Sequence, residues 1–393
     1  MNQSSRRTFI SRLSAGVAAT VVAGRAGGAD ATGRVRVGVI GGGNQAKQHL
    51  RSLKQLNDVE VAYVCDIDPR RLAECESLAV GAKGVGDMRK VFDDKTVDAV
   101  TIVTPDHWHT PAALLALAAG KHVYVEKPCS HNFREGQMLV DAAQQNGRMV
   151  AHGTQARSNP GFQEAIKLLR DGVIGEVLIA KCWNWQRRKN IGHGTPSDPP
   201  PGVDYDAWVG PAEWVPFQAN RFHYDWHWWF NFGCGDMGND GIHEVDYALW
   251  GLGVDSQPAT VSAVGGKYYF DDDQQFPDTQ QVTMEWPGDG QPGSQRMLIF
   301  EQRLWSNSYP FNTDSGAEFF GTKGRMLLSK RGKFEVWGDD NKRLDVALQH
   351  SPKTDVVDNQ RNWIACIKSG ETPHATIEIG RRTADVVHLG NIA

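Results

Sequence analysis

Residues 35–46 read VRVGVIGGGNQA, and this stretch decides the fold of the chain. Its first half is an apolar run rich in valine that ends in three glycines, which predicts a buried parallel strand followed by a tight turn. Gly41, Gly43 and Ala46 occupy the small-residue positions of the pattern G-x-G-x-x-G/A, for the turn, for close approach to a pyrophosphate and for helix packing. Free N–H groups at the start of the following helix, near Asn44 and Gln45, then face a diphosphate, and both residues are predicted to bind the cofactor.

A carboxylate at the end of the next strand supports this interpretation. Residues 45–56 predict a helix, and residues 59–68, VEVAYVCDID, predict a second strand that contains Asp66 near its end. A carboxylate at this distance from the glycines suits the ribose hydroxyls of NAD. Asp66 disfavours the additional phosphate of NADP, although Arg70 and Arg71 keep NADP possible. The alternative is a glycine turn in an α/β domain that binds no ligand.

Strands and helices continue to alternate up to residue 152. Residues 97–104 and 121–125 predict two more strands, so residues 33–152 are expected to form a doubly wound parallel sheet, a Rossmann domain. The segment 105–109 is expected to be a loop, with a helix over 111–119. Ligands bind at the carboxyl edge of such sheets. Further cofactor-binding residues are therefore predicted where these strands end, namely Thr104, Pro105, His109, Glu126 and Lys127.

The pattern changes after residue 152. Longer segments of alternating polarity, such as 259–270, 280–286 and 295–304, predict an α+β domain over residues 153–393 with a large, mainly antiparallel sheet. Two helical patterns, 354–369 and 377–393, follow near the end of the chain.

The composition is that of a soluble globular protein. The 393 residues carry a net charge of −4 without a dense basic run in the body of the chain, so nothing indicates nucleic-acid binding. The six cysteines are scattered without C-x-x-C spacing and are expected to be free and buried. The 13 tryptophans gather mainly between residues 183 and 250, which indicates an aromatic core or surfaces on which sugars stack.

The N-terminus is expected to be a twin-arginine signal peptide over residues 1–31. Arg6 and Arg7, an apolar stretch over 15–23 and an A-x-A site at 29–31 occur in that order. The apolar stretch is too short for a membrane anchor. A periplasmic or otherwise exported protein with no membrane attachment after cleavage is therefore predicted, and a chance Arg-Arg pair in a leader is the alternative.

Two residues are candidates for acid–base chemistry. Lys127 follows a buried strand and precedes a proline, so the backbone fixes its position beside the cofactor crevice, where it suits a hydrogen-bond donor or proton relay. His243 and Asp246 lie three residues apart on a predicted helix, so Asp246 is expected to orient the imidazole of a general base. The alternatives are a solvated lysine at a strand end and a structural histidine.

Other groups are weaker candidates. His107 and His109 form an H-x-H pair, but no third ligand is evident, so no metal site is predicted. No G-x-S-x-G motif supports a serine hydrolase. Polar groups in or near the aromatic region are structural or form a rim that binds a sugar. The predicted substrate-binding residues are Lys127, Gln155, Arg157, His223, Asp225 and His243, and the wider rim includes Arg188 and Tyr224.

Taken together, the chain resembles the Gfo/Idh/MocA oxidoreductase family, which includes glucose-fructose oxidoreductase and inositol dehydrogenase. The resemblance rests on GGGNQA, on TPDHWH at 104–109, on EKP at 126–128 and on the G-x-H-x-x-D element at 241–246. It implies a Rossmann domain followed by an open sheet that often forms dimers or tetramers. It also implies that Lys127 and His243 are the catalytic pair.

One departure from the family concerns the residue four places before the histidine. Many members carry Asp there, whereas this chain has Asn239, followed by Asp240. An amide binds a hydroxyl but does not relay a proton, so Asp240 or Lys127 compensates, or the chemistry is altered. Asn239 and Asp240 are therefore counted with the catalytic residues.

The resemblance implies hydride transfer between NAD(P) and a hydroxyl of a sugar or cyclitol. Because an exported enzyme meets no dinucleotide pool, the cofactor is expected to be tightly held and regenerated in each cycle. A redox-neutral, NAD-dependent glycosidase is the alternative, although the Tyr-Pro-Thr-His element associated with that branch is absent around His243. A non-catalytic sugar-binding protein is a further alternative.

Overall fold

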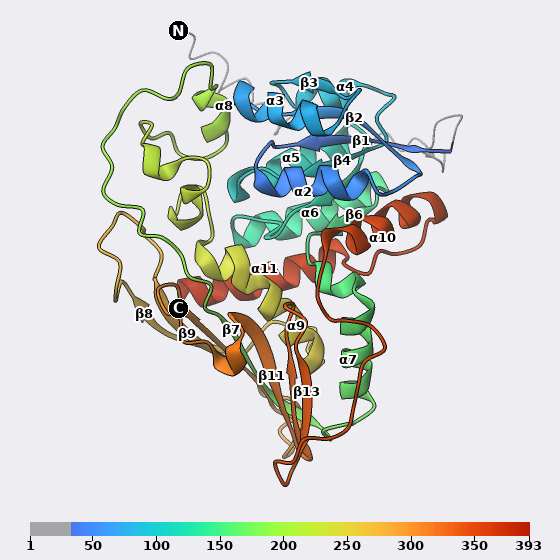
Figure 1. Cartoon of the computed structure of the whole chain (residues 1–393), viewed down its shortest axis with the longest axis vertical. Helices are drawn as coiled ribbons and strands as arrows, with labels where there is room; N and C mark the ends of the chain where they lie inside the picture. The colour runs from blue at the N-terminus through green and yellow to red at the C-terminus, as the bar shows by residue number, and fades with distance from the viewer. Residues whose placement is uncertain (1–32) are drawn as a thin grey trace.

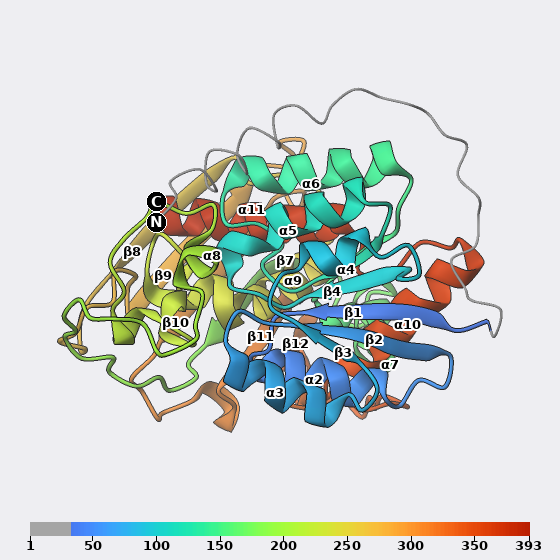
Figure 2. The same cartoon turned by 90° about the horizontal axis from the view of Figure 1, so that it is seen from above.

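The computed structural model describes residues 33–393, so the predicted signal peptide lies outside the described residues. The first sheet has six parallel strands in the order β3-β2-β1-β4-β5-β6. Helices cover both faces, with α2 and α3 on one side and α5 and α6 on the other (Figure 2). The elements of this layer are β1 (Val35–Ile40), α2 (Asn44–Leu53), β2 (Val59–Cys65), α3 (Pro69–Leu78), β3 (Lys83–Val85), α4 (Arg89–Asp93), β4 (Ala99–Ile102), α5 (Asp106–Ala118), β5 (His122–Val125), α6 (Phe133–Asn146) and β6 (Val150–His152).

The strand order reverses between β1 and β4, which are neighbours in the sheet although β2 and β3 separate them in sequence. This is the topological switch point of a doubly wound fold, where the carboxyl ends of the strands leave a crevice for a ligand. The predicted Rossmann domain is therefore confirmed.

The second sheet has seven strands in the order β13-β12-β11-β7-β10-β9-β8. The β7–β10 pair is parallel and the other pairs are antiparallel. The strands are β7 (Val177–Asn184), β8 (Thr260–Gly266), β9 (Thr279–Trp286), β10 (Arg296–Arg303), β11 (Ser315–Gly321), β12 (Gly324–Leu328) and β13 (Phe334–Gly338). Buried residues alternate with exposed ones along β9, so one face of the mixed, mainly antiparallel sheet is covered and the other is open.

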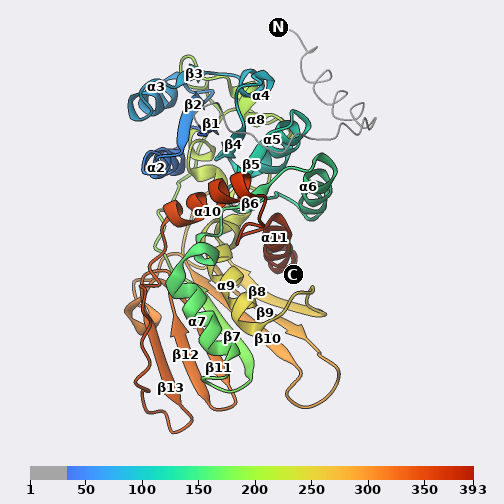
Figure 3. The same ribbon diagram turned by 90° about the vertical axis from the view of Figure 1, so that its right-hand side faces the viewer.

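Helices α7 (Pro160–Arg170) and α9 (Ile242–Leu252) lie on the covered face of this sheet (Figure 3). Helix α9 packs Val245, Ala248 and Leu249 into the main hydrophobic core. It directly follows η4 (Met237–Gly241), a π-helical turn, and such turns often occur at functional sites. The position of α9 places the start of this helix between the two sheets (Figure 1).

Three sequence expectations are corrected by the structure. The segment 105–109 is not a loop, because α5 begins at Asp106 and contains Pro111. The helix starts early because His107 and Trp108 are held by the chain at 207–232: His107 N–H donates to Phe232 O (3.2 Å) and Trp108 Nε1 donates to Trp208 O (3.0 Å). Strands β3 and β11 were not expected.

The third correction concerns the domain boundary. Helix α10 (Val356–Ser369) lies against the first sheet, not the second (Figure 3). Trp363 and Ile364 share a buried cluster with Val35 and Val39 of β1. The chain therefore returns to the first domain after the second sheet, and the last helix, α11 (Ile377–Ile392), lies beside α6.

Within residues 33–393, all six cysteines are free and buried. No helix in this range is both long and apolar enough to cross a bilayer. The same residues contain no cluster of three or more His, Cys, Asp or Glu side chains arranged to hold a metal ion.

Candidate active site

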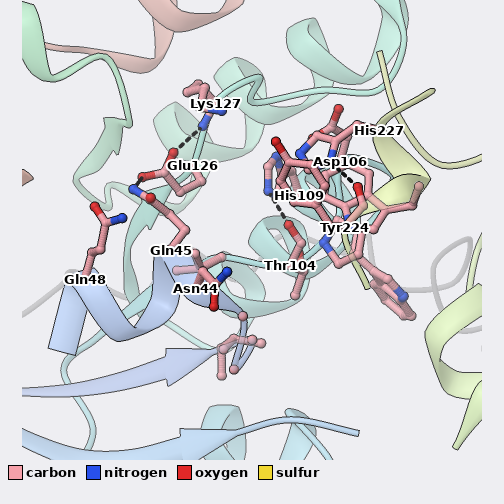
Figure 4. Close-up of a pocket in the computed structure, with 18 of the residues that line it drawn as sticks. Asn44, Gln45, Gln48, Thr104, Asp106, His109, Glu126, Lys127, Tyr224 and His227 are labelled. Atoms are coloured by element: carbon pink, nitrogen blue, oxygen red, sulfur yellow. Dashed lines mark hydrogen bonds between the residues drawn. The ribbon is translucent and has the colours of Figure 1, made fainter. Parts of the chain in front are cut away.

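A cavity of about 650 Å³ runs from the glycine turn after β1, past the ends of β4 and β5, to the start of α9. Figure 4 shows Asn44 and Gln45 on one side of it and Tyr224 and His227 on the other. The cavity brings together most of the predicted site residues, namely Gly41, Gly43, Asn44, Gln45, Asp66, Thr104, Pro105, His109, Glu126, Lys127, Gln155, His223, Asn239, Asp240 and His243.

The glycine turn has the shape that a dinucleotide needs. Gly41 has φ +102°, and a Cβ there would lie 2.4 Å from Val103 O. Gly43 is the N-cap of α2, and a Cβ on it would project to 3.3 Å from Arg71 Nη1, on the cavity side. Ala46 is fully buried and does not line the cavity, as its predicted packing role requires. The helix start is therefore open to a pyrophosphate.

Asp66 is fixed at the end of β2. Its carboxylate accepts hydrogen bonds from Gly42 N (2.5 Å) and Asp68 N (2.7 Å). Burial raises its pKa above the usual value, although these backbone donors and Arg71 oppose the rise. In the described part of the chain, Thr104 Oγ1 is a buried cavity-lining hydroxyl without a hydrogen-bond partner. The glycine cradle, the fixed carboxylate and the unpartnered hydroxyl fit a nicotinamide dinucleotide.

Lys127 joins the two domains across the cavity. Glu126 before it is buried and is held by His49 Nε2 (2.8 Å) and by Lys127 N (3.1 Å), and the Lys127–Pro128 peptide is cis. Lys127 Nζ donates to Asn239 O at 2.5 Å. The amine of the first domain thus meets the π-helical turn that precedes α9.

His243 lies in the first turn of α9 and lines the same cavity. Burial, followed by the charges of Lys330 and Lys127, holds the pKa of the imidazole well below its usual value. Asp240 partly opposes these effects. The ring is therefore uncharged at neutral pH and able to accept a proton from a hydroxyl.

The carboxylate that acts on His243 is Asp240 and not Asp246. The expectation for Asp246 was wrong, because its buried carboxylate accepts from Arg157 Nε (2.9 Å) and from Thr383 Oγ1 (3.1 Å). Asp240 accepts from Arg188 and lies 3.5 Å from Lys330 Nζ. Burial favours the neutral form of Asp240, but Lys330, Arg188 and Lys127 hold its pKa well below the usual value.

Two predicted substrate contacts lie outside the cavity, and a third lies at its ribose end. Arg157 does not line the cavity, because its guanidinium is paired with Asp246 and stacked over Trp250 at 4.5 Å. Asp225 does not line it either. His223 does, but its Nε2 lies 3.2 Å from Asp68 Oδ2, next to Arg71, at the end of the cavity where Asp66 stands. His223 therefore belongs to the ribose end of the site.

The H-x-H pair has structural partners. His107 Nε2 lies 2.8 Å from Trp208 O, and in His109 Nδ1 lies 2.6 Å from Pro128 O and Nε2 lies 2.8 Å from Thr104 O. Burial lowers the pKa of these two histidines to about 3 and about 4. Both rings thus anchor the start of α5.

Several lining residues were not predicted from the sequence, namely Trp208, Trp226, His227, Lys330 and Arg331. Lys330 and Arg331 belong to SKRGK at 329–333, the turn between β12 and β13. A basic turn of this kind is usually solvated, so the sequence contains no signal for its position beside His243.

Two family models match the chain. Residues 35–154 match the Gfo/Idh/MocA oxidoreductase family, NAD-binding Rossmann fold, and residues 164–290 match the C-terminal alpha/beta domain of the same family. The two matched segments together make up more than half of the chain. The chain belongs to the Gfo/Idh/MocA oxidoreductase family. Its first domain is an NAD-binding Rossmann domain, as the sequence predicted.

Individual relatives agree with this assignment. Inositol 2-dehydrogenase of Salmonella typhimurium is 34% identical over 148 residues, which are 37% of this chain and 44% of that relative, so this match spans less than half of the relative. Inositol 2-dehydrogenase 2 of Saccharopolyspora erythraea is 25% identical over 356 residues, 90% of this chain and 91% of the relative. A solved levoglucosan dehydrogenase complexed with NADH and levoglucosan superposes with a TM-score of 0.70 at 18% identity, covering 91% of this chain and 96% of the other.

Proposed function

We propose that this protein is an NAD-dependent oxidoreductase that transfers hydride between a tightly held nicotinamide and a CH–OH group of a sugar or cyclitol. The observation that carries the proposal is the position of Lys127 and His243 in one cavity that begins at the glycine cradle. The curated relatives named above are inositol dehydrogenases, which supports a polyol substrate.

The bound nicotinamide supplies the hydride acceptor in this scheme. His243, uncharged at neutral pH, accepts the proton of the substrate hydroxyl, and Asp240 stabilises the resulting imidazolium. Lys127 donates a hydrogen bond to the substrate oxygen, with its amine oriented by Asn239 O at 2.5 Å. The buried Glu126, which accepts from Lys127 N (3.1 Å), fixes the backbone at the base of that lysine.

The preference for NAD follows from Asp66, whose carboxylate occupies the place that the additional phosphate of NADP would need. The guanidinium of Arg71, beside Asp66, is the group that would bind the additional phosphate of NADP. Identification of the bound dinucleotide distinguishes NAD from NADP.

Export by the twin-arginine route remains part of the proposal and rests on the residues Arg6 and Arg7 and on the stretch that follows them. In the periplasm the cofactor must be regenerated within each cycle. A homo-oligomer formed through the open face of the second sheet is also proposed.

The central experiment releases and identifies the dinucleotide that copurifies with the full-length protein. Monosaccharides, inositols and glycosides are then screened for a change in nicotinamide absorbance. Release of a glycoside's aglycone without net reduction would replace the oxidoreductase by the redox-neutral glycosidase. Sugar binding without either reaction would indicate a non-catalytic protein.

Substitutions at the two proposed acid–base residues test the mechanism. We expect Lys127→Met and His243→Ala each to lower the rate of nicotinamide reduction by about 10²–10⁴-fold, the usual contribution of a positioned acid or base. Lys127 is also a predicted cofactor-binding residue, so the dinucleotide content of each variant is measured and the reduction rate is expressed per bound dinucleotide. Single-turnover reduction of the bound cofactor measures the effect. Unchanged reduction rates in both variants would refute the catalytic assignment.

A further inference from the structure

We propose that Lys330, in the turn between β12 and β13, is a positioning residue that fixes the carboxylate of Asp240 in the cavity that His243 also lines, and that it thereby controls the acid–base state of this pair. This role rests on the proposed function, since it concerns the same acid–base pair. Nothing in the sequence around Lys330 indicates it, because the residue reaches the site only through the tertiary structure.

The turn directs Lys330 inward. Gly332 N–H donates to Ser329 O (2.9 Å), which closes a four-residue turn with Lys330 at its second position. Ser329 Oγ donates to Ser315 O (2.6 Å), and Thr354 N–H donates to Lys330 O (3.2 Å), so both sides of the turn are held. Lys330 is 8% exposed, which is unusual for a lysine without partners.

The amine of Lys330 pairs with two carboxylates, Asp240 in η4 and Glu244 in α9. Lys330 Nζ lies 3.5 Å from Asp240 Oδ1 and 3.1 Å from Glu244 Oε1. Arg188 contacts the other oxygen of Asp240 and also pairs with the buried Asp236 at 3.0 Å. Asp240 is therefore held between two cations from the second domain, one on each oxygen. Its carboxylate is fixed at the start of α9, three residues before His243.

The groups that face His243 come from several elements. Lys127 and Glu126 stand at the end of β5, Lys330 lies in the β12–β13 turn and Asp240 lies in η4. Burial and the two lysines favour the neutral imidazole, whereas Asp240 and Glu126 favour the charged form. Both lysines line the cavity with His243, and Lys330 also contacts the opposing carboxylate of Asp240 at 3.5 Å. Removal of Lys330 should therefore change the protonation of His243.

The test measures the protonation of His243 directly, by NMR titration of the full-length protein with its bound dinucleotide and isotope-labelled histidine. The His243 signal is assigned by its loss in His243→Gln. In Lys330→Met we expect the pKa of His243 to rise by at least one unit, about a tenfold gain in proton affinity. Lys330→Arg, which keeps the charge, should titrate as the parent does.

Lys333→Met is the matched control. Lys333 lies in the same turn and carries the same charge, but its amine donates to Phe311 O and does not line the cavity. Its His243 titration should equal that of the parent. If Lys330→Met does not fold, Lys330→Gln carries the same prediction. A pKa of His243 that is the same with and without the Lys330 charge would overturn the proposal.

The titration requires no substrate, so its outcome is independent of the screen for activity. Once a substrate is known, the acid limb of kcat/KM should move to higher pH in Lys330→Met by the same amount as the pKa of His243. Failure of every sugar to reduce the cofactor would refute the proposed function and leave the result of the titration standing.

Discussion

Asn239 and Asp240 are two neighbouring residues with different tasks. Asn239 is buried and bridges the domains, since its carbonyl accepts from Lys127 Nζ and its amide donates to Asp236 Oδ1 at 3.0 Å. Asp240 carries the charge that acts on His243. The departure from the family pattern thus keeps a carboxylate near the imidazole, one residue later, within a π-helical turn.

Asp106 gives a second prediction about a single residue, which concerns how the stability of the protein changes with pH. Its buried carboxylate accepts from Cys234 N at 3.1 Å, and burial raises its pKa from 3.8 to about 7. Between these values the folded state binds one more proton than the unfolded state, so the group's contribution to stability falls as pH rises. Between about pH 4 and pH 7, the free energy of unfolding of the parent should fall by about 1.4 kcal/mol per pH unit relative to that of Asp106→Asn.

Urea unfolding of the parent and of Asp106→Asn at pH 5 and pH 7 measures this difference. Effects of other titrating groups are common to both proteins and cancel. Asp141→Asn, at an exposed position of α6, is the control; it retains Asp106, so its stability should fall between the two pH values as that of the parent does. Equal pH dependence of the parent and Asp106→Asn would show that the carboxyl is not held in its protonated form.

At the scale of elements, one segment of the second domain is hydrogen-bonded to the first domain on both sides of the cofactor crevice. Residues 202–233, called here the covering segment, contain α8 (Tyr205–Val209) and η3 (Asp225–Trp228) and form an aromatic cluster that includes Trp208, Phe222 and Trp226. Asp204 N–H donates to Ile67 O after β2, and His107 N–H donates to Phe232 O at α5. The segment is therefore attached to the first domain on both sides of the crevice.

His223 links the covering segment to the ribose end of the site. It has φ +60° and contacts Asp68 Oδ2 at 3.2 Å, and burial lowers its pKa to about 4, so a neutral ring donates this bond at pH 7. We expect His223→Asn, which tolerates the positive φ, to accelerate dinucleotide dissociation about tenfold, because this one contact contributes about 1–1.5 kcal/mol.

Dissociation is followed by the fluorescence change as the bound NADH is displaced by excess unlabelled NAD. Asp225→Asn is the control, since it lies in the same segment but does not line the cavity. An unchanged dissociation rate in His223→Asn would show that this contact of the covering segment does not help to retain the cofactor.

At the scale of the whole molecule, the first domain is completed by the end of the chain. Trp363 of α10 is fully buried, with its ring centroid 5.6 Å from that of Tyr124 in β5. Asn359, on the same helix, donates to Tyr124 Oη (3.0 Å) and His152 O (2.8 Å). Residues 33–152 therefore lack part of their core without α10.

Trp363→Ala should lower the free energy of unfolding by about 3–5 kcal/mol, as expected for removal of a fully buried tryptophan. The dinucleotide content should fall with it, because the cavity lies in the same domain. Trp214→Ala, at a side chain that is 50% exposed, is the control and should change stability little. Chemical denaturation with the dinucleotide absorbance as a second probe tests this. A stable Trp363→Ala protein with its full dinucleotide content would contradict the role of α10.

The sequence by itself determined the Rossmann fold and the glycine cradle with Asp66, and it predicted Lys127 and His243 as candidates, a pair that the family resemblance then implied. These features depend on local order, since a strand, a glycine turn and a helix fix the neighbouring residues whatever else the chain does. Likewise, Lys127 was predictable because it directly follows a buried strand.

Only the tertiary structure decided which distant residues complete the site. Asp246 and Asp240 are equally close to His243 in sequence, but Asp246 is paired with Arg157 outside the cavity, whereas Asp240 contacts Lys330 and Arg188 and lines the cavity with His243. The positions of Lys330, His223 and Trp363 likewise depend on how the second sheet, the covering segment and α10 pack against the first domain. Packing between segments a hundred or more residues apart leaves no periodicity or spacing in the sequence. This is why the roles of Lys330 and Trp363 could not be predicted, and why His223 was predicted as a substrate contact and not at the ribose end.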